Sequence, residues 1–339
     1  MSHKNKSLED FIDPDSKKIS WTRELKQDLQ KNKKAQFEFD NIIASIYRPF
    51  CKEFLYFNRQ FNNCVYKMPY VYTWKHKENL TICLTGRGSS KDFSALISNI
   101  LPDLEMISKS QCFPLYSYEK VEKTDQISLF TKNESYTKKE NIPDIILGDF
   151  QQTYGDQTIT KEDIFYYVYG ILHSPEYKER FAADLKKMLP RIPYAKDFWE
   201  FSKAGRELAH WHLNYETIEP YPLKEYQSEL YLDDADYRVE KMRFGKRNKD
   251  KTTIIYNSKI TLSEIPLEAY DYIVNGKSAL EWIIERYQVK KDKASGIVND
   301  PNDWSEDPRY IVNLVKRIVR VSVETVKIVN SLPTLNERN

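Results

Sequence analysis

Arginine and asparagine occur together in one aromatic-rich stretch of this sequence, as Arg48, Arg59, Asn62 and Asn63. Arginine can pair with two acceptors on guanine, and asparagine can pair with the edge of adenine, so these residue types can read bases in a duplex. The same residues also fit ordinary structure, with the arginines on an edge strand and the asparagines in a turn. The sequence leaves both interpretations open.

Clustered lysines and arginines form a second group that could contact nucleic acid. Although the net charge is only +2, the segment 238–251 (RVEKMRFGKRNKDK) holds seven basic and two acidic residues. Cations contact phosphates without regard to base sequence, so they would position the protein on DNA. The candidate contacts are Lys246, Arg247, Lys249 and Lys251, then Lys290, Lys291 and Lys293, and also Arg87. A solvated hairpin tip would explain the basic residues of 246–251 nearly as well.

Motifs for ATP hydrolysis, methyl transfer and metal-dependent cleavage do not occur in the sequence. The segment 86–91 (GRGSSK) lacks the spacing of a phosphate-binding loop. There is no Asn/Asp-Pro-Pro-aromatic motif for a flipped base, and neither Asp103 nor Asp144 precedes a convincing Asp/Glu-x-Lys strand. We therefore expect no catalytic residue, no cofactor and no metal site.

Histidines and cysteines give no metal-ligand pattern either. His210 and His212 would diverge by about 200° on a helix, so we expect surface or helix-end positions for them. His173 is expected to pack or cap beside Pro175. The cysteines have no zinc-type spacing, and we expect reduced, at least partly buried thiols at Cys51, Cys64, Cys83 and Cys112.

The composition is that of a globular protein with many aromatic residues. Of 339 residues, 40% are hydrophobic and 30% are charged, and nine glycines contrast with 24 tyrosines and 16 phenylalanines. Few glycines argue against a nucleotide-binding α/β fold, and tyrosines suit a contact surface, although AT-rich codon usage would also supply them. The polar first residues and the absence of a long apolar run lead us to expect a cytoplasmic protein without contact to a membrane.

Periodicity predicts an α+β fold with short mixed or antiparallel sheets, a predominantly helical C-terminal half and a long closing helix. The strongest helix signal lies in 274–304, where a turn at Asn275–Gly276 precedes an amphipathic run and the basic loop 290–293. Thr160 and Asp163 predict a capping box at the start of another helix. The predicted helices cover 19–34 (capped by Ser20), 93–97, 160–172, 175–188, 198–213 and 310–332.

Strands are predicted mainly in the first half of the chain. We expect a hairpin that turns at Asn62–Asn63, a strand over 80–85 and another over 112–118, and a later hairpin of 237–244 and 252–256 around a basic tip. The polar segment 120–139 is the best candidate for an insertion or linker. The predicted organisation is a basic arm (1–40), a β-rich lobe (41–158) and a helical α+β recognition lobe (159–339), which could also form one continuous specificity domain.

Several long stretches resemble one protein family, in the order of that family. They are ISWTRELKQDL, IYRPFCKEFLYFNRQFNNCVYKMP, SQCFPLY, ITKEDIFYYVYGILHSPEYKERFAADLKKMLPRIP, DFWEFSKAGRELAHWHLNYE, YRVEKMRF and SALEWIIERYQVKKDKASGIVNDPNDW. Together they make the chain similar to the C-terminal specificity region of Type ISP restriction–modification enzymes, in which nuclease, helicase-like ATPase and adenine methyltransferase parts precede a target-recognition region.

The resemblance implies a non-catalytic module that binds double-stranded DNA and presents a site to the methyltransferase and helicase-like ATPase domains, in cis or in trans. The arm would lead toward the methyltransferase. Base-reading positions vary with the target in this family, so the resemblance assigns no contact residue. Two alternatives remain: a scaffold that docks onto the catalytic part through Trp21, Tyr47, Phe50 and the closing helix, and a cryptic metal-dependent nuclease.

Overall fold

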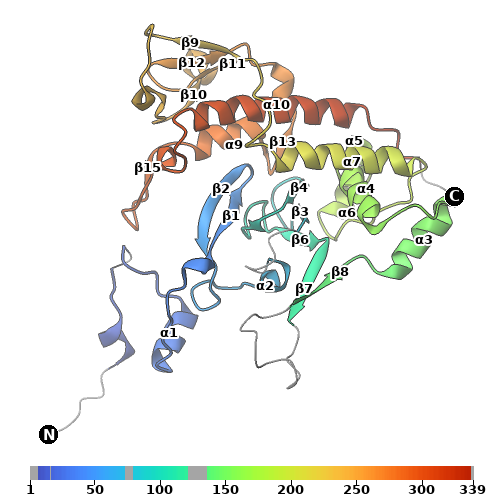
Figure 1. Ribbon diagram of the computed structural model, residues 1–339, viewed down its shortest axis with the longest axis horizontal. Helices are drawn as coiled ribbons and strands as arrows, with labels where there is room; N and C mark the ends of the chain where they lie inside the picture. The colour runs from blue at the N-terminus through green and yellow to red at the C-terminus, as the bar shows by residue number, and fades with distance from the viewer. Residues whose placement is uncertain (1–6, 16, 73–78, 121–135, 337–339) are drawn as a thin grey trace, which may run out of the picture.

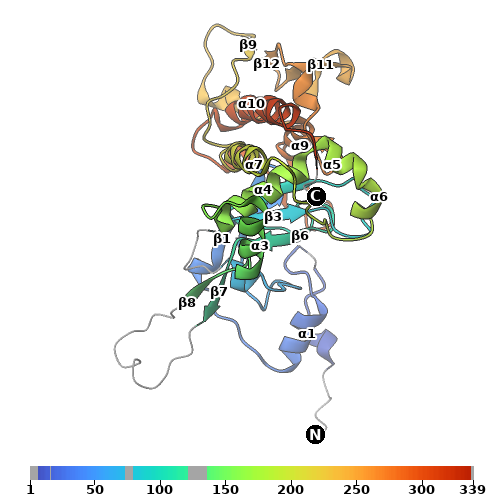
Figure 2. The same ribbon diagram turned by 90° about the vertical axis from the view of Figure 1, so that its right-hand side faces the viewer.

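The computed structural model describes residues 7–15, 17–72, 79–120 and 136–336. Its elements lie in tiers, with a small sheet at one end, helices in the middle and short sheets beyond them (Figures 1 and 2). The predicted α+β class, the short sheets and the closing helix are confirmed. No helix within the described ranges is long and apolar enough to cross a lipid bilayer.

The first tier is an antiparallel sheet that lies over the closing helix (Figure 1). Its strands follow the order β10 (Arg243–Phe244), β11 (Asp250–Ile255), β12 (Ile260–Ser263) and β9 (Lys224–Gln227). Beneath it, α10 (Tyr310–Asn330) buries an apolar stripe at helical spacing that includes Ile311, Leu314, Val315, Ile318 and Val319. The stripe explains why this segment folds as one long helix against the body.

The middle tier also contains two helices in close contact, α4 (Lys161–His173) and α7 (Phe198–Leu213). Thr160 caps α4 in the predicted capping box with Asp163. The helices approach so closely that a Cβ at Gly205 would lie 1.8 Å from the Tyr166 carbonyl oxygen. Only glycine fits at that crossing.

The neighbouring helices differ from the prediction. The predicted helix over 175–188 is two short ones, α5 (Pro175–Arg180) and α6 (Ala182–Leu185), and α3 (Asp144–Tyr154) was not predicted. In the arm, α1 (Arg23–Gln30) is capped by Thr22, whose side chain accepts from the Leu25 amide, and not by Ser20. The helix therefore begins later than the apolar spacing suggested.

The β1–β2 hairpin turns earlier than predicted. β1 (Ile42–Arg48) and β2 (Cys51–Tyr56) pair around Pro49–Phe50, so the hairpin predicted at Asn62–Asn63 is wrong. Proline presets a turn backbone, and Phe50 accepts a left-handed φ of 58° with its ring fully buried. β5 (Leu101–Pro102) adds to β1 in parallel.

A second small sheet has the order β4 (Ala95–Ser98), β3 (Thr81–Leu84) and β6 (Gln111–Pro114). The strand predicted over 80–85 is confirmed as β3. The helix predicted over 93–97 is wrong, because β4 is buried along its whole length and a short apolar run does not distinguish strand from helix. The strand predicted over 112–118 divides into β6 and β7 (Tyr116–Lys120).

The remaining elements are short. β7 pairs with β8 (Tyr136–Glu140), and most of the predicted insertion 120–139 lies outside the described residues. The strand predicted over 237–244 shortens to β10, since the Val239 backbone pairs with the Asn302 side-chain amide at 2.7 and 2.8 Å. Also present are η1 (Leu8–Phe11), η2 (Phe39–Asn41), α2 (Met68–Val71), η3 (Asp234–Tyr237), η4 (Leu267–Tyr270), β13 (Ile273–Val274), β14 (Lys277–Ser278), α9 (Ala279–Arg286), β15 (Lys290–Lys291), β16 (Val298–Asn299) and η5 (Pro301–Asp303).

Two large hydrophobic clusters hold these elements together. One joins Phe50 and Cys51 of the β1–β2 turn to α9, α10 and the first-tier sheet, and the other joins β3 and β4 to α4 and α7. Both clusters cross the boundary predicted at residue 158. The division into lobes stays a prediction, and the shared cores favour the alternative of one continuous domain.

His212 lies in the last turn of α7, so the expected helix-end position is confirmed, but the residue is buried and the alternative of a surface position is wrong for it. Its Nδ1 lies 2.6 Å from the Tyr169 hydroxyl, its Nε2 lies 2.9 Å from the Thr325 hydroxyl, and its ring stacks on Tyr272. Burial lowers the pKa of His212 well below its usual range. His173 is buried as expected, whereas His210 is exposed.

Candidate nucleic-acid interface

α9 organises the basic segments of the C-terminal half. The Ser278 hydroxyl accepts from the Glu281 amide and Glu281 accepts from the Ser278 amide, a capping box that fixes the start of the helix. Leu280 and Ile283 are fully buried, and Trp282 donates its ring N–H to the Val274 carbonyl at 2.7 Å. The predicted amphipathic helix in 274–304 is confirmed, and it is anchored at its start and along its buried face.

The tip of the β10–β11 hairpin presents cations at the first-turn end of α9. Lys246, Arg247 and Asn248 all adopt left-handed backbone conformations, with φ of 44°, 56° and 68°. The side chains of Lys246, Arg247 and Lys249 are exposed and form no ion pair with any described residue. Residues other than glycine rarely adopt this backbone consecutively, so the tip keeps a strained shape that holds the cations outward.

Lys251 has a different role from the rest of this tip. Its ammonium lies 3.1 Å from the Glu281 carboxylate and about 5.0 Å from the centre of the Tyr270 ring. Burial opposes ionisation of Glu281, but hydrogen bonds from Ser278 and Lys251 outweigh it and lower the pKa of that carboxyl group. Lys251 therefore attaches the hairpin to α9 and is only partly available to a phosphate.

The other basic segment follows the last turn of α9. β15 and β16 form a small hairpin in which Lys290 pairs with Asn299 and Lys291 with Val298. The hairpin protrudes from the body (Figure 1), and Lys290, Lys291 and Lys293 are exposed. The Val289 amide donates to the Glu240 carbonyl at 2.9 Å, which connects its base to the segment before β10. An eight-residue helix is about 12 Å long, so basic groups flank α9 at both ends.

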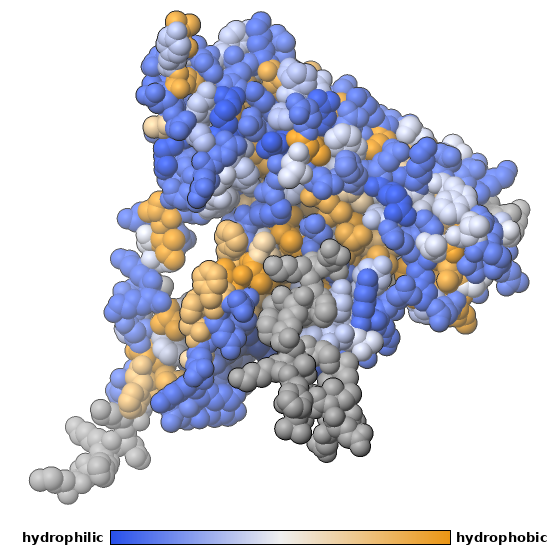
Figure 3. All heavy atoms as spheres, in the orientation of Figure 1, coloured by the Kyte–Doolittle hydropathy of each residue, from blue (hydrophilic) through white to orange (hydrophobic). Residues whose placement is uncertain are grey.

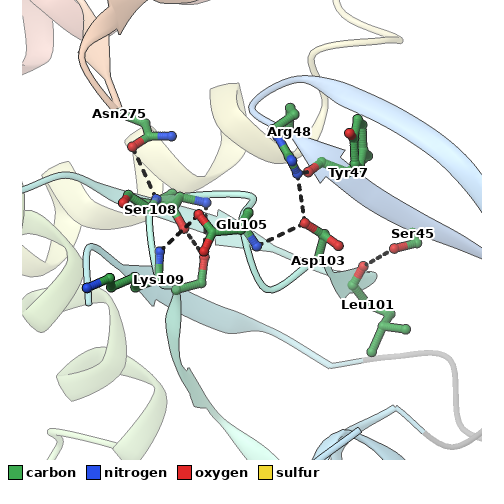
Figure 4. Close-up of polar contacts among 11 residues, drawn as sticks. Ser45, Tyr47, Arg48, Leu101, Asp103, Glu105, Ser108, Lys109 and Asn275 are labelled. Atoms are coloured by element: carbon green, nitrogen blue, oxygen red, sulfur yellow. Dashed lines mark hydrogen bonds and ion pairs between the residues drawn. The ribbon is translucent and has the colours of Figure 1, made fainter. Parts of the chain in front are cut away.

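Arg87 lies in a loop beside the first-turn end of α9. Gly86 packs directly on Lys109, where a Cβ would meet the Lys109 carbonyl oxygen at 1.9 Å. The Ser108 amide donates to the Asn275 side chain at 3.1 Å, which joins this loop region to the turn before α9 (Figure 4). Arg87 itself is exposed.

Lys91 belongs to the same cationic surface, although it was not predicted. A Cβ at Gly276 would lie 3.3 Å from the Lys91 side chain, so Lys91 lies against the turn that leads into α9. Lys91 could have been noticed because it ends the segment 86–91 (GRGSSK). The spacing of that segment excludes a phosphate-binding loop for ATP, but it does not exclude a contact between Lys91 and DNA.

Among the arginine and asparagine candidates of 46–69, Arg48 lies at the β1–β2 turn, where the Tyr287 hydroxyl at the end of α9 donates to the Phe50 carbonyl at 3.3 Å. Arg48 donates to the Asp103 carboxylate at 2.7 Å and stacks on Tyr47, so its guanidinium is already engaged (Figure 4). Asn62 accepts from the Asn58 amide. Arg59 and Asn63 are exposed. Of the base-reading candidates, these two have no side-chain partner among the residues that the structure describes.

Asn63 lines one of two cavities that share a wall. They have volumes of about 370 and 850 Å³, and both are lined by Tyr66, Met68, Leu104, Ser110 and Cys112. The smaller also contacts Phe54, Phe57 and Phe61. The resulting groove is mainly apolar, in contrast to the cationic surface around α9.

An aromatic face extends from this groove to the N-terminal arm. It consists of Phe37, Phe39, Phe54, Phe61 and Tyr66, whose exposed fractions are 72, 76, 79, 43 and 71%. The Phe37 ring stacks on Tyr56 with the ring centres 5.4 Å apart. Figure 3 shows hydrophobic residues gathered below α10, around the β1–β2 hairpin. Large exposed apolar patches usually mark interaction sites.

The part of the chain that the structure describes contains no candidate metal site. No group of three or more histidine, cysteine, aspartate or glutamate side chains there could hold a metal ion.

A family model matches residues 2–314, nearly the whole chain, and its description is the Type ISP C-terminal specificity domain. The chain belongs to this family. The predicted resemblance is therefore confirmed, and the chain is a specificity domain, a class of recognition domain rather than of catalytic domain.

Solved structures of Type ISP enzymes are similar over almost the entire chain. The ATP-dependent Type ISP restriction–modification enzyme LlaBIII bound to DNA shares 37% identity over 95% of this chain, with a TM-score of 0.85. A nuclease-deletion mutant of LlaGI with a DNA substrate mimic shares 38% over 98% (TM-score 0.82), and the DrdV–DNA complex shares 32% over 97% (TM-score 0.80).

This specificity domain spans only 20, 28 and 32% of the lengths of LlaBIII, LlaGI and DrdV. Among curated protein sequences, none matches the chain significantly.

Proposed function

We propose that this specificity domain binds duplex DNA and presents an asymmetric site to an adenine methyltransferase and helicase-nuclease of a bacterial Type ISP system. The observation that carries the proposal is the cationic surface at both ends of α9, where Lys246, Arg247 and Lys249 form no ion pair with a described residue. Unpaired cations on a rigid frame suit phosphates, which fix position and register. The three DNA-bound relatives support the same function.

In this proposal the domain carries no chemistry of its own. Methyl transfer, ATP hydrolysis and cleavage belong to the other parts of the enzyme, which act in the bacterial cytoplasm where the DNA is. The cationic surface around α9 would set register, and exposed polar side chains near it would read base edges in the major groove.

The direct test is fluorescence anisotropy of labelled mixed-sequence duplexes at low salt. Wild-type protein is expected to bind weakly but measurably. Reversal of Lys246, Arg247 and Lys249 to glutamate should weaken binding by roughly tenfold or more, since fewer counterions are released from the DNA when fewer phosphates are neutralised. The matched control reverses Lys187, Lys196 and Lys203, which are also exposed. Equal weakening in both variants, or no binding by the wild type, would contradict the proposal.

A second function, docking onto another protein domain, is favoured by the aromatic face. The scaffold predicted from the sequence used Phe50, but Phe50 is fully buried and belongs to the core. Phe37, Phe39 and Phe54 are instead the most exposed aromatic side chains of the aromatic face. Exposed aromatic and apolar side chains of this kind are typical of contacts with protein.

The occupant that we propose for this face is a folded domain of the kind that precedes the specificity domain in relatives. Those chains are much longer than this one, and the family's domain is C-terminal in its enzymes. Phe37 and Phe39 lie in the arm just before β1, so a preceding domain would be near the face.

Co-purification tests the docking proposal. The probe is LlaBIII produced without its own specificity domain and carrying an affinity tag. It should retain the wild-type chain and the variant with reversed Lys246, Arg247 and Lys249, but lose the variant with serine at Phe37, Phe39 and Phe54. DNA binding by the serine variant shows that it is folded. Retention of the serine variant would place the docking surface elsewhere.

A further inference from the structure

We propose that Cys83 and Cys112 form a site of reversible oxidation, at which a small disulfide converts the two thiols into one intramolecular disulfide. The proposal is independent of DNA binding and of docking. It depends on the register of one strand pair, on the contact between the two sulfurs and on access from the apolar groove.

Register places the two cysteines opposite each other. β3 and β6 are antiparallel, and Cys83 is the direct partner of Cys112. Directly opposed residues in such a pair have Cα atoms about 4.5–5.5 Å apart, which lies inside the range that a disulfide spans. The two sulfur atoms are already 3.5 Å apart. Rotation of the side chains would therefore suffice, without a change in strand register.

Access is unequal at the two sulfurs. Cys83 is fully buried on the central strand of its sheet, whereas Cys112 is partly exposed on the edge strand β6. Cys112 also lines both cavities of the apolar groove, with Met68 and Leu104. A small reagent in the groove therefore meets Cys112 first and reaches Cys83 only through it.

The reaction balances as two thiol–disulfide exchanges. The Cys112 thiolate attacks one sulfur of the small disulfide, forms a mixed disulfide and expels one thiolate. Cys83 then loses its proton, and its sulfur attacks the Cys112 sulfur and expels the second thiolate. The reagent gains two electrons and the cysteine pair loses two. Burial raises the pKa of the Cys83 thiol, so the second exchange is the slow one.

The chain contains two internal controls. Cys51 is buried beside the β1–β2 turn and has no cysteine partner, so it should stay reduced. Cys64 is exposed and also has no partner, contrary to the burial expected from the sequence. Cys64 can form only a mixed disulfide with the reagent or a bond to another molecule, so the test is made with the Cys64→Ser variant.

The experiment treats the full-length Cys64→Ser protein with oxidised glutathione and follows its intact mass and free thiols. The expected product has a mass lower by two hydrogen atoms, keeps one titratable thiol of three, and returns to the starting mass with dithiothreitol. Peptide mapping should link β3 to β6. An unchanged mass, or glutathione that remains on Cys112 at the end point, would overturn the proposal.

Two further variants in the same background separate the steps. Cys83→Ser should stop at a stable glutathione adduct on Cys112, and Cys112→Ser should not react at Cys83. In the intact pair, oxidation should raise the melting temperature by several degrees, because the bond restricts the unfolded chain. Reaction of Cys83 in the absence of Cys112 would contradict the proposed order.

Discussion

At the scale of single residues, two glycines set the distance between α4 and α7. A Cβ at Gly170 would lie 2.2 Å from the Phe201 carbonyl oxygen, and one at Gly205 would lie 1.8 Å from the Tyr166 carbonyl oxygen. Backbone atoms cannot move aside as the end of a flexible side chain can, so a methyl group must push the helices apart.

We expect Gly205→Ala to lower the free energy of unfolding by about 2–4 kcal/mol, since overpacking outweighs the gain in helix propensity. Gly148→Ala is the matched control, because Gly148 lies in α3 and a Cβ there would have no neighbour within 4 Å. That change should be neutral or stabilise the protein by up to about 1 kcal/mol. Urea unfolding of both variants checks the prediction, and similar values for the two would refute it.

His173 gives a residue-scale prediction about pH. Burial, with a smaller contribution from Lys178, lowers its pKa to about 3, whereas an unfolded histidine titrates near about 6.5. The unfolded chain therefore binds a proton that the folded protein excludes, and this histidine costs stability as the pH falls from about 6.5 toward about 3. Above about pH 7 the histidine is neutral in both states and has no such effect.

The variant His173→Gln should remove that part of the pH dependence. Between about pH 6 and pH 5, the wild type should lose up to about 1.4 kcal/mol per pH unit more than the variant. The measurement is urea unfolding at several pH values, with acidic groups contributing equally to both proteins. Parallel curves would show that His173 does not titrate on unfolding.

Residue roles that depend on local sequence were predictable, and those that depend on distant contacts were not. The Thr160–Asp163 capping box spans one turn and could be predicted from its spacing. The ring nitrogens of His212 lie beside the hydroxyl groups of Tyr169 and Thr325, which are 43 and 113 residues away in the sequence. No local sequence pattern predicts such a contact. From its position near a helix end alone, a histidine is expected at the surface.

At the scale of elements, α9 holds two cationic segments at its ends. The segments were predicted from their charge, and their common frame was visible only in the structure. Lys251 shows why: its ammonium lies 3.1 Å from the Glu281 carboxylate, which attaches the hairpin to α9 and leaves Lys251 only partly available to a phosphate. The charges in a sequence identify candidate phosphate contacts. The distances from these basic groups to acidic partners in the structure then show which of them stay available to a phosphate.

The β15–β16 hairpin should contribute to DNA binding separately from the β10–β11 tip. Reversal of Lys290, Lys291 and Lys293 to glutamate should weaken binding and reduce the salt slope by about one for each phosphate that is no longer neutralised. The effect should be similar for different duplex sequences, because phosphate contacts carry no base information. Anisotropy on two unrelated duplexes checks this, and weaker binding to only one of them would point to base reading.

Strands were predicted less well than helices for a physical reason. The apolar run of β4 is short and buried on both faces, which removes the alternation of a half-exposed strand and leaves the sequence compatible with a helix. The β1–β2 turn depended on a core pocket for Phe50, formed partly by Tyr215 and Tyr272 from much later in the chain. Long helices such as α7 and α10 carry their own periodicity and were predicted closely.

At the scale of the whole molecule, recognition surfaces of opposite character share one hydrophobic frame. The β1–β2 turn inserts Phe50 into the core under α10, so the hairpin beside the aromatic face shares one hydrophobic cluster with α9 and α10. Glu225 strengthens the frame, since it accepts from Arg309 at 2.8 Å and Lys316 at 2.6 Å and joins β9 to α10. If both proposals are correct, DNA and a partner domain would occupy different surfaces of this domain.

The most direct test of the central claim is the salt dependence of duplex binding by the whole chain. If the cationic surface contacts four to six phosphates, the logarithm of the association constant should fall with the logarithm of the salt concentration with a slope of about −4 to −5. Reversal of Lys246, Arg247 and Lys249 should make the slope shallower by about 3. Absence of binding at low salt, or a slope near zero, would contradict the assignment of this domain as a DNA-recognition module.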